Sequence, residues 1–386
     1  MKIIIYLFLC SIVFASSFID ELDKGASYYK KGQYEKALEI FDRVLINHPN
    51  SKRARLEYAR VLFAMGRYEE SKKEFIIVLN QNPPPLVKKN IKWFLKRIEK
   101  RQKTNFFNGC IAVGVVSDSN IENKSDNPVY AGFIDSNTKK REDRFVTTEF
   151  TLQYQKKLKD AIWGNTLYLY DESSHSSSKD KISYVNLTTA YKFFILGIRV
   201  SLPFSLSYTQ IDKKAYMQTI ALNPSIAKKI ESIVFMGNIG FEKNKNKDNS
   251  EKSTKVYSAG VKFLWRLYKF SNVVGFSFKD YERLNGSRID VAKKRESFFF
   301  GTSYSLLKTN LLNLLYKKSR DKYKEKDPSI VDERVDKTDR YNFNFQQNIK
   351  KDLYYQLGFS KISNKSNLDI YSYDKNLVTF KVTKKF

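Results

Sequence analysis

Residues 374–386 read DKNLVTFKVTKKF, and apolar and polar side chains alternate along this stretch. Val378, Phe380, Val382 and Phe386 fall on one face of an extended strand, while the opposite face carries threonine and lysine. The same alternation recurs through the last three quarters of the chain, with few helical stretches to cover the apolar face. A strand of this kind that ends on Phe is typical of the closing strand of an outer-membrane β-barrel. We therefore assign Phe380 and Phe386 as its barrel-closure and insertion signal.

Composition agrees with a barrel. The 386 residues include 25 Tyr and 29 Phe, which membrane barrels place in girdles at the two interfaces. The mean hydropathy of -0.49 is compatible with this fold, because only every second strand residue needs to be apolar. A soluble all-β domain is the alternative, but it would need helices or a second sheet to cover the apolar face, and the sequence offers few of these.

The chain is strongly basic, with 69 Lys and Arg against 41 Asp and Glu and a net charge of +28. Nucleic-acid binding would require this charge to be concentrated, whereas the lysines are spread over turns, loops and one strand face. We exclude nucleic acid as a partner. Anionic lipid head groups of the outer membrane, or an acidic partner, fit better.

Residues 1–17, MKIIIYLFLCSIVFASS, have a basic residue, a short apolar run and small residues after it. This pattern predicts a secretory signal peptide, too short to span a bilayer as a helix.

Residues 18–103 have a helical period and repeat themselves with an offset of 34. The spacing and residue types are those of tetratricopeptide repeats, two of them complete, with a further helix after the prolines at 83–85 as a cap. The matched pairs are Gly25 and Ala59, Tyr28 and Leu62, Gly32 and Gly66, Tyr34 and Tyr68, Ala37 and Ser71, Phe41 and Phe75, Val44 and Val78, and Pro49 and Pro83.

The face lined by the first helices of the repeats is a candidate groove for an extended polypeptide, and a plain solvated face is the alternative. Leu22, at its edge, belongs to the same predicted face. The candidate groove residues are Tyr29, Lys30, Arg53, Arg60 and Phe63.

Residues 104–386 hold about fourteen alternating segments, each long enough to cross a bilayer at a tilt. The alternation is plainest at 257–265, 341–349 and 353–360, where Asn, Gln, Ser and Gly oppose aromatic and aliphatic residues. Short turns are predicted near 156–160, 194, 229–231, 268, 308 and 350–352. Long loops are predicted at 118–142, 171–180, 242–252, 282–294, 318–337 and 363–374.

The sequence carries no pattern for catalysis, and we expect no enzyme activity, cofactor or metal. His48 and His175 are the two histidines; the first precedes a proline, and the second lies in a serine-rich loop without an acid partner at informative spacing. Asp118 and Asn120 follow the first strand. They are expected to shape a turn through Asx hydrogen bonds, with substrate contact as the alternative.

Two segments narrow the choice of protein family that the chain resembles. They are PPPLVKKNIKWFLKRIEKRQ at 83–102 and GCIAVGVVSDSNIENKS at 109–125. With the order of signal, tetratricopeptide repeats and barrel, they make the chain resemble the surface lipoprotein assembly modulator (Slam) family. In that family a helix led by proline precedes a first strand that ends in an Asp-x-Asn-like motif, here Asp118 to Asn120, and the barrel has fourteen strands. The chain departs from the family in its short helical domain and its strong positive charge.

The resemblance implies an outer-membrane translocator that delivers a specific lipoprotein, or a secreted haem- or metal-scavenging protein, from periplasm to cell surface. The helical domain would then lie in the periplasm. The implied partners are the exported protein, outer-membrane lipid, the barrel-assembly machinery and, as a further candidate, a periplasmic chaperone. An exopolysaccharide exporter and a porin-like channel with a repeat domain remain alternatives.

Fourteen strands lie between small filled barrels and open porins, so we expect a plug or a lateral gate between the first and last strands. A disulfide between the strand at Ala112 and the strand at Thr379 would test the gate.

Overall fold

The computed structural model describes residues 18–125, 129–130, 133–134, 140–176, 181–288, 290–307, 309–326 and 333–386. The predicted signal peptide, residues 1–17, lies outside the described residues. The chain divides into two compact units, one up to Lys103 and one from Thr104, and each is described by itself.

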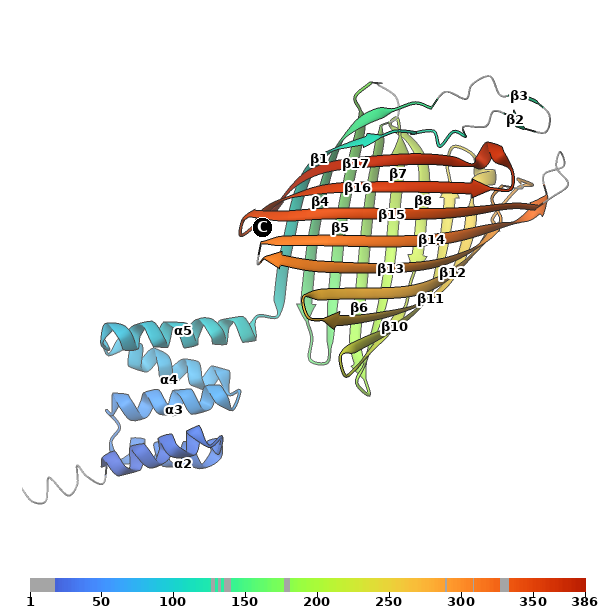
Figure 1. The fold of residues 1–386 in the computed structure, drawn as a ribbon. Coiled ribbons are helices and arrows are strands. Elements are labelled where there is room, and N and C mark those ends of the chain that lie inside the picture. The colour runs from blue at the N-terminus through green and yellow to red at the C-terminus, as the bar shows by residue number, and fades with distance from the viewer. Residues whose placement is uncertain are drawn as a thin grey trace, which may run out of the picture. The chain divides into compact units, whose positions relative to one another are not determined.

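The first unit is a set of antiparallel helices (Figure 1). Gly32 and Gly66, one in each repeat, have positive φ values of 74° and 79° and allow the tight turns between paired helices. Ser51 caps the third helix by accepting a hydrogen bond from the Ala54 N–H, and Pro85 begins the last. The helices are residues 18–30, α2 (Tyr34–Asn47), α3 (Lys52–Ala64), α4 (Tyr68–Asn80) and α5 (Pro85–Gln102).

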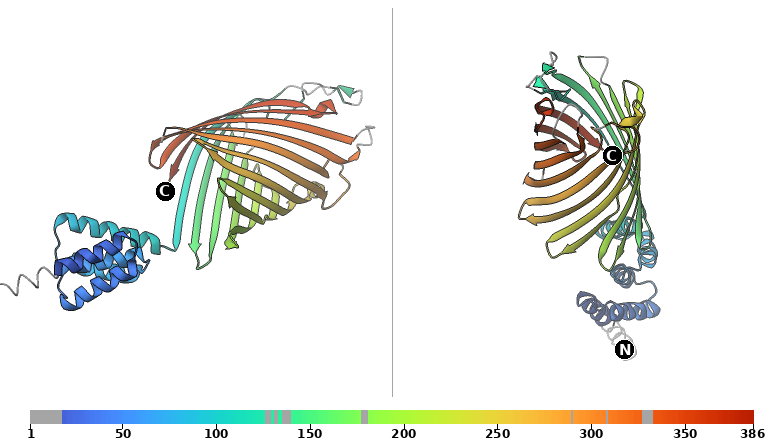
Figure 2. Two further views of the ribbon diagram at one scale, coloured as in Figure 1. Left: turned by 60° about the horizontal axis from the view of Figure 1, so that its bottom comes forward. Right: turned by 90° about the vertical axis from the view of Figure 1, so that its right-hand side faces the viewer.

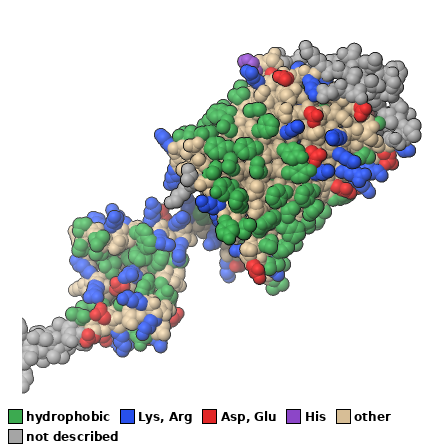
Figure 3. Space-filling model, viewed as in Figure 1, with side chains coloured by type: hydrophobic (Ala, Val, Ile, Leu, Met, Phe, Trp, Pro, Cys, Tyr) green, Lys and Arg blue, Asp and Glu red, His purple; other side chains and the backbone are tan. Residues whose placement is uncertain are grey.

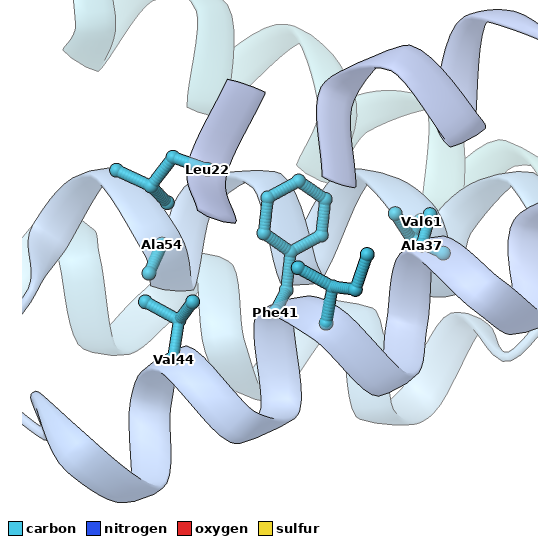
Figure 4. Close-up of a cluster of buried hydrophobic side chains, with 7 residues drawn as sticks. Leu22, Ala37, Phe41, Val44, Ala54 and Val61 are labelled. Atoms are coloured by element: carbon cyan, nitrogen blue, oxygen red, sulfur yellow. The ribbon is translucent and has the colours of Figure 1, made fainter. Parts of the chain in front are cut away.

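Equivalent positions of the two repeats form the cores of this unit, which confirms the tetratricopeptide prediction. Phe41 and Phe75 are both fully buried, each at the centre of its own cluster. Gly25 lets the first helix approach closely, since a Cβ there would lie 2.8 Å from the Phe41 ring. The first cluster, drawn in Figure 4, includes Leu22, Ala37, Phe41, Val44, Ala54 and Val61.

No helix among the described residues is long and apolar enough to cross a bilayer.

The second unit is a closed antiparallel β-barrel (Figures 1 and 2). β1 pairs with both β4 and β17, and β10 pairs with β11, so the sheet closes on itself. β8 and β9 both pair with β7 and β10, so they share one place in the wall, interrupted at 223–224. The fifteen strands therefore fill fourteen places, as predicted.

The bounds of the wall strands are β1 (Asn105–Asp118), β4 (Asp143–Lys157), β5 (Ala161–Ser174), β6 (Ile182–Ile195), β7 (Ile198–Ile211), β8 (Lys214–Leu222), β9 (Ser225–Ile230), β10 (Ile233–Asn246), β11 (Thr254–Leu267), β12 (Phe270–Arg283), β13 (Lys293–Leu307), β14 (Asn310–Lys326), β15 (Glu333–Lys350), β16 (Leu353–Ser366) and β17 (Tyr373–Lys385). β2 (Val129–Tyr130) and β3 (Phe133–Ile134) pair separately, and η1 (Ser250–Lys252) and η2 (Asp369–Tyr371) are short 3-10 turns.

Alternate side chains face outward and are apolar. Along β1, Ile111, Val113 and Val115 are 44%, 52% and 45% exposed, and β17 shows Val378 and Phe380 likewise. Figure 3 shows hydrophobic side chains covering much of one outer face. A closed wall with an exposed apolar belt faces lipid rather than water, which makes this an outer-membrane β-barrel.

Inward side chains are polar and bond to one another across strands. Ser360 donates to Asn342 at 2.7 Å, and the Thr188 and Ser205 hydroxyls lie 2.8 Å apart. The polar lumen expected from the Asn and Gln rows is therefore present, since these groups would be costly against a dry core.

We call the end of the barrel that holds Asn105 the turn end and the opposite end the loop end. Most predicted connections that fall on described residues are where the sequence placed them, and the turn predicted at 308 lies outside the described residues. One connection was missed: Asp212 and Lys213 form a two-residue turn at the loop end, between β7 and β8. Both residues have positive φ, 52° and 65°, as a tight hairpin of this hand requires.

The predicted loop at 318–337 was too long. β14 and β15 run for 17 and 18 residues, so the charged residues 318–326 belong to a strand. A barrel wall can continue beyond the apolar band into polar surroundings, where charged side chains are not penalised. Polarity therefore did not mark the end of these strands.

Candidate functional site: the seam between β17 and β1

The first and last strands meet along a seam, as the sequence predicts. Their register runs from Cys110 opposite Lys385 to Asp118 opposite Leu377. Below it, Gly109 and Phe386 exchange two backbone hydrogen bonds of 3.0 Å. β17 and β1 lie at opposite ends of the barrel sequence and no hairpin joins them, so they can separate without disrupting a turn.

The two edges of β1 are paired over different lengths at the turn end. The pairing of β17 with β1 starts at the Gly109–Phe386 pair, whereas the pairing of β4 with β1 starts at Asn105. Phe107, in the stretch between these two points, is 66% exposed.

An aromatic clamp lies on the outer face where the pairing of β17 with β1 starts. A Cβ on Gly109 would lie 2.2 Å from the Phe386 ring, so only glycine leaves room for the ring to cross β1. Beyond it the ring stacks near Phe150 of β4, with centroids 6.2 Å apart. Phe386 thereby links β17 to the far side of β1.

An ion pair bridges the seam on the lumen face. Lys381 of β17 binds Glu149 of β4 at 3.1 Å. Gly114, which pairs with Lys381, lies between them and has no side chain; a Cβ there would lie 3.2 Å from the Lys381 Cβ and 2.8 Å from the Phe380 carbonyl oxygen. The small residue lets the lysine pass over β1.

A latch holds the loop end of the seam, and its centre is Asn120. The side chain is fully buried; its amide donates to the Lys124 and Asp374 carbonyls at 2.9 and 3.2 Å, and its oxygen accepts from the Lys124 N–H at 2.9 Å. Asp118 accepts from the Asn120 N–H at 2.9 Å, the Asx turn expected from the sequence. The first loop is thus bonded to the start of the last strand.

Charge strengthens this latch. Lys375 of β17 binds Asp118 at 2.8 Å, with both side chains 12% exposed, and also donates to Asn123 at 3.0 Å. Ser119 and Asn376 exchange two more hydrogen bonds. Asp118 and Asn120, predicted as a first-loop motif, therefore lie directly against β17.

The loop beyond the latch is fastened by Glu122, which pairs with Lys124 at 2.8 Å and with Arg141 at 3.5 Å. The hydrogen bond from Lys124, helped by the charges of Lys124 and Arg141, holds the pKa of Glu122 below its usual 4.5. The carboxylate stays ionised at neutral pH and ties the two sides of the loop together.

In the helical unit, the structure brings only part of the predicted groove together. Arg60 lies over the Tyr29 ring at 5.3 Å and binds Glu57 through both carboxylate oxygens. Arg53 binds Asp23 at 3.1 Å, and Lys30 is exposed. Phe63 turns instead toward the second core.

Phe63 packs edge-on against Phe94, with ring centroids 5.2 Å apart, and the Arg101 guanidinium lies 5.0 Å from the centroid of the Phe63 ring. Leu22, predicted on the groove face, is a core residue at 2% exposure, because the first helix packs that side against α2. The remaining surface is a mixed basic and aromatic patch around Tyr29, Arg60 and Lys30.

The sequence did not reveal the Lys381–Glu149 bridge or the role of Gly109 and Gly114. Partners far apart in the chain cannot be identified without the register. Glycines in a strand are nevertheless a recognised sign of close approach, and both occur in the first strand.

Within the part of the chain that the structure describes, no group of three or more His, Cys, Asp or Glu side chains could hold a metal ion. Cys110 is free and half-buried.

Comparison with known proteins identifies the helical unit. Residues 28–89 match the tetratricopeptide repeat family. No curated protein sequence matches the chain significantly.

Solved outer-membrane barrels are similar over the strands. A loop L8 deletion mutant of OmpT, an outer membrane protein of Vibrio cholerae, covers 74% of this chain and all of its own, with 6% identity and a TM-score of 0.45. The anion-selective porin from Comamonas acidovorans covers 73% and 99%, with 10% identity and a TM-score of 0.41. The outer membrane channel DcaP of Acinetobacter baumannii covers 73% and 97%, with 10% identity and a TM-score of 0.44. These similarities are too weak to assign a family or an activity.

Proposed function

We propose that the protein is an outer-membrane translocator that delivers a specific protein, either a lipoprotein or a secreted haem- or metal-scavenging protein, from the periplasm to the cell surface. In this arrangement the helical unit and the turn end lie in the periplasm, and the long loops lie outside. The resemblance to surface lipoprotein assembly modulators supplies the cargo classes. A lateral opening between β17 and β1 would give the cargo a route out of the barrel, which a plain channel does not need.

The observation that carries the proposal is the uneven closure of the seam. Its loop end is latched by Asn120 and by the Lys375–Asp118 pair, whereas at the turn end the two strands meet at the Gly109–Phe386 backbone pair. Cargo arriving from the periplasm would meet the end without the latch first and would pair there with β1 in place of β17. As the cargo pairs further along β1 toward the loop end, each hydrogen bond between β1 and β17 would be replaced by one between β1 and the cargo. Each step would therefore cost little free energy.

The helical unit supports the same function. Tetratricopeptide repeats stack into surfaces that bind polypeptide segments, and only Lys103 and Thr104 separate α5 from β1. A bound cargo segment is therefore held within a short length of chain of the barrel, which raises its effective concentration there.

A porin-like channel is the second candidate, and the lumen favours it. Lys381, Lys262 and Lys279 face inward on separate strands, and Glu149 and Glu242 pair with the first and the last of them, so the interior offers small ions a polar path lined with charged groups.

Gene deletion separates the candidates. With intact cells treated with protease or antibody, a translocator predicts loss of one surface protein, which should accumulate in the periplasm and return on complementation. An exopolysaccharide exporter predicts loss of capsule, and a channel predicts altered uptake of small anions; either result with unchanged surface proteins would overturn the proposal.

A further inference from the structure

The outer face of the barrel has a hollow that a smooth lipid-facing wall would lack. It measures about 1050 Å³ and runs across β9 to β14. Gly237 and Ala259 lie on its floor, where neighbouring outward positions carry large side chains. Its walls are the apolar side chains of Val200, Pro224, Ile226, Ile239, Val261 and Phe276.

One end of the hollow is basic. Along β14 the outward side chains change from Leu314 and Tyr316 to Lys318 and Arg320, and both of these line the hollow. Lys318 lies opposite Phe298, which is outward and apolar, and Arg320 lies opposite Glu296. Within the described residues no ion pair involves Lys318 or Arg320.

More basic residues extend this end. On the outward positions of β13 to β16, the same loop-side level carries further exposed lysines and fewer acids, and Figure 3 shows Lys and Arg gathered there. The members of this basic tier are Lys294, Lys318, Arg320, Lys322, Lys337, Lys361 and Lys365.

The height of the basic end matches a membrane interface. Arg320 lies ten residues along β14 from Asn310 (320 minus 310). At about 3.3 Å per residue and a tilt of about 40°, this is roughly 25 Å above the turn end, the height of the apolar band in such barrels. Lys318 and Arg320 therefore lie where lipid head groups begin.

A second hollow repeats the design. It measures about 450 Å³, has Leu187, Leu206 and Ile220 on its apolar side, and ends at Lys243 and Lys245. Both lysines lie in the loop-side half of β10. Two separate hollows thus pair an apolar trough with cations at the same side of the bilayer.

From this complementarity we propose that the β9–β14 hollow and its basic tier bind a phosphorylated, acylated glycolipid of the outer leaflet. The acyl chains occupy the apolar trough, and the phosphates bind Lys318 and Arg320. Arginine and lysine next to an apolar surface recognise both parts of such a molecule, and the low dielectric near lipid strengthens the ion pairs. The site goes beyond the proposed function, and it rests on the loop end facing outward.

The test uses the full-length protein, purified in detergent and examined by native mass spectrometry with added bisphosphorylated lipid A. The wild-type protein is expected to retain one lipid molecule at the hollow. The double variant Lys318→Ser/Arg320→Ser should bind roughly tenfold more weakly, because two charge-assisted contacts are lost. The matched control is Lys317→Ser/Arg340→Ser, which removes the same charges from the lumen side of β14 and β15 and should bind as the wild type does.

Two further binding measurements test the apolar trough and the lipid specificity separately from the charged residues. Gly237→Leu fills the trough without touching a charge, since a Cβ there meets Ile226 only at 3.6 Å, and it should weaken binding with the barrel still folded by heat-modifiable mobility. Lipid A without phosphates, and phosphatidylglycerol, should bind the wild type poorly. Equal loss in the lumen control, equal binding of phosphatidylglycerol, or an unchanged Lys318→Ser/Arg320→Ser variant would each overturn the proposal.

Discussion

Single residues decide whether the seam closes, and Gly109 is the clearest case. Its missing side chain is what allows Phe386 to cross β1 and reach Phe150. The sequence pointed to Phe386 from its place at the end of an alternating strand. It could not point to Gly109, because the need for glycine arises from a residue 277 positions away (386 minus 109).

Gly109→Ala should therefore destabilise the barrel by about 1–3 kcal/mol, because the added methyl forces the Phe386 ring out of place. Urea unfolding in lipid vesicles measures this. Gly164→Ala is the matched control: a Cβ there has its nearest neighbours at 3.6 Å, so it should be neutral or stabilising. Equal effects of the two substitutions would contradict the clamp.

Asn120→Ala removes the centre of the latch. It leaves the Lys124 N–H and the Asp374 carbonyl without their side-chain partner, at a cost of about 1–3 kcal/mol. Hydrogen exchange should become faster in residues 119–125 and 373–377. The control Asn246→Ala removes another buried Asn, at the end of β10, whose side chain accepts from the Asp248 and Asn249 N–H groups, and should leave those segments unchanged.

Glu122 makes the loop sensitive to acid. Its pKa is lower in the folded protein than its usual 4.5, so its stabilising contribution is complete above pH 4.5 and is lost as the pH falls through the lower folded value. Exchange in the first loop should rise only below pH 4.5, and Glu122→Gln should abolish that dependence. A folded pKa at or above 4.5, measured by NMR, would exclude this role.

At the scale of elements, alternation predicted the strands well and their ends poorly. The apolar faces of β11, β15 and β16 were clear because lipid contact imposes a period of two. The turn at Asp212 and Lys213 was missed because neither residue is Gly or Asn. The distance between the turns predicted at 194 and 229 was the available signal, since it exceeds a single crossing.

The register also corrects the crosslink that tests the gate. Ala112 lies opposite Thr383, and Thr379 lies opposite Val116. Ala112 and Thr383 are a non-hydrogen-bonded pair, whose Cα atoms are about 4.5 Å apart, within reach of a disulfide.

In a Cys110→Ser background, Ala112→Cys/Thr383→Cys should stop surface display when oxidised and restore it when reduced. The control pair Thr188→Cys/Ser205→Cys joins β6 to β7, where the two hydroxyls are 2.8 Å apart, and should have no effect. Normal display with the seam crosslink formed would show that cargo does not use this route.

For the whole molecule, the proposed function would assign recruitment to the unit up to Lys103 and passage to the unit from Thr104. Deleting residues 18–103 should leave a folded, heat-modifiable barrel in the outer membrane and abolish display of the cargo. Separate expression of the helical unit should then capture the cargo without displaying it. Full display by the barrel alone would remove the helical unit from the mechanism.

The net charge of +28 also has an explanation at this scale. The excess of basic residues is distributed over the helical unit, the lumen wall and the outward basic tier of β13 to β16, rather than over one compact patch. The sequence could reveal that the charge is spread. Assigning each lysine to the lumen or to the lipid side requires knowing which alternate residues of each strand face inward.

The short turn at Asp212 and Lys213 gives the rim an uneven height. β14 and β15 extend for 17 and 18 residues, whereas β7 ends at Ile211 with only that turn above it, almost across the ring. The rim of the barrel is therefore lower at the turn between β7 and β8 than at β14 and β15. Under the proposed function, a domain that emerges at the surface would meet the longer strands β14 and β15 on one side and the low turn on the other, so its release would favour the side of β7 and β8.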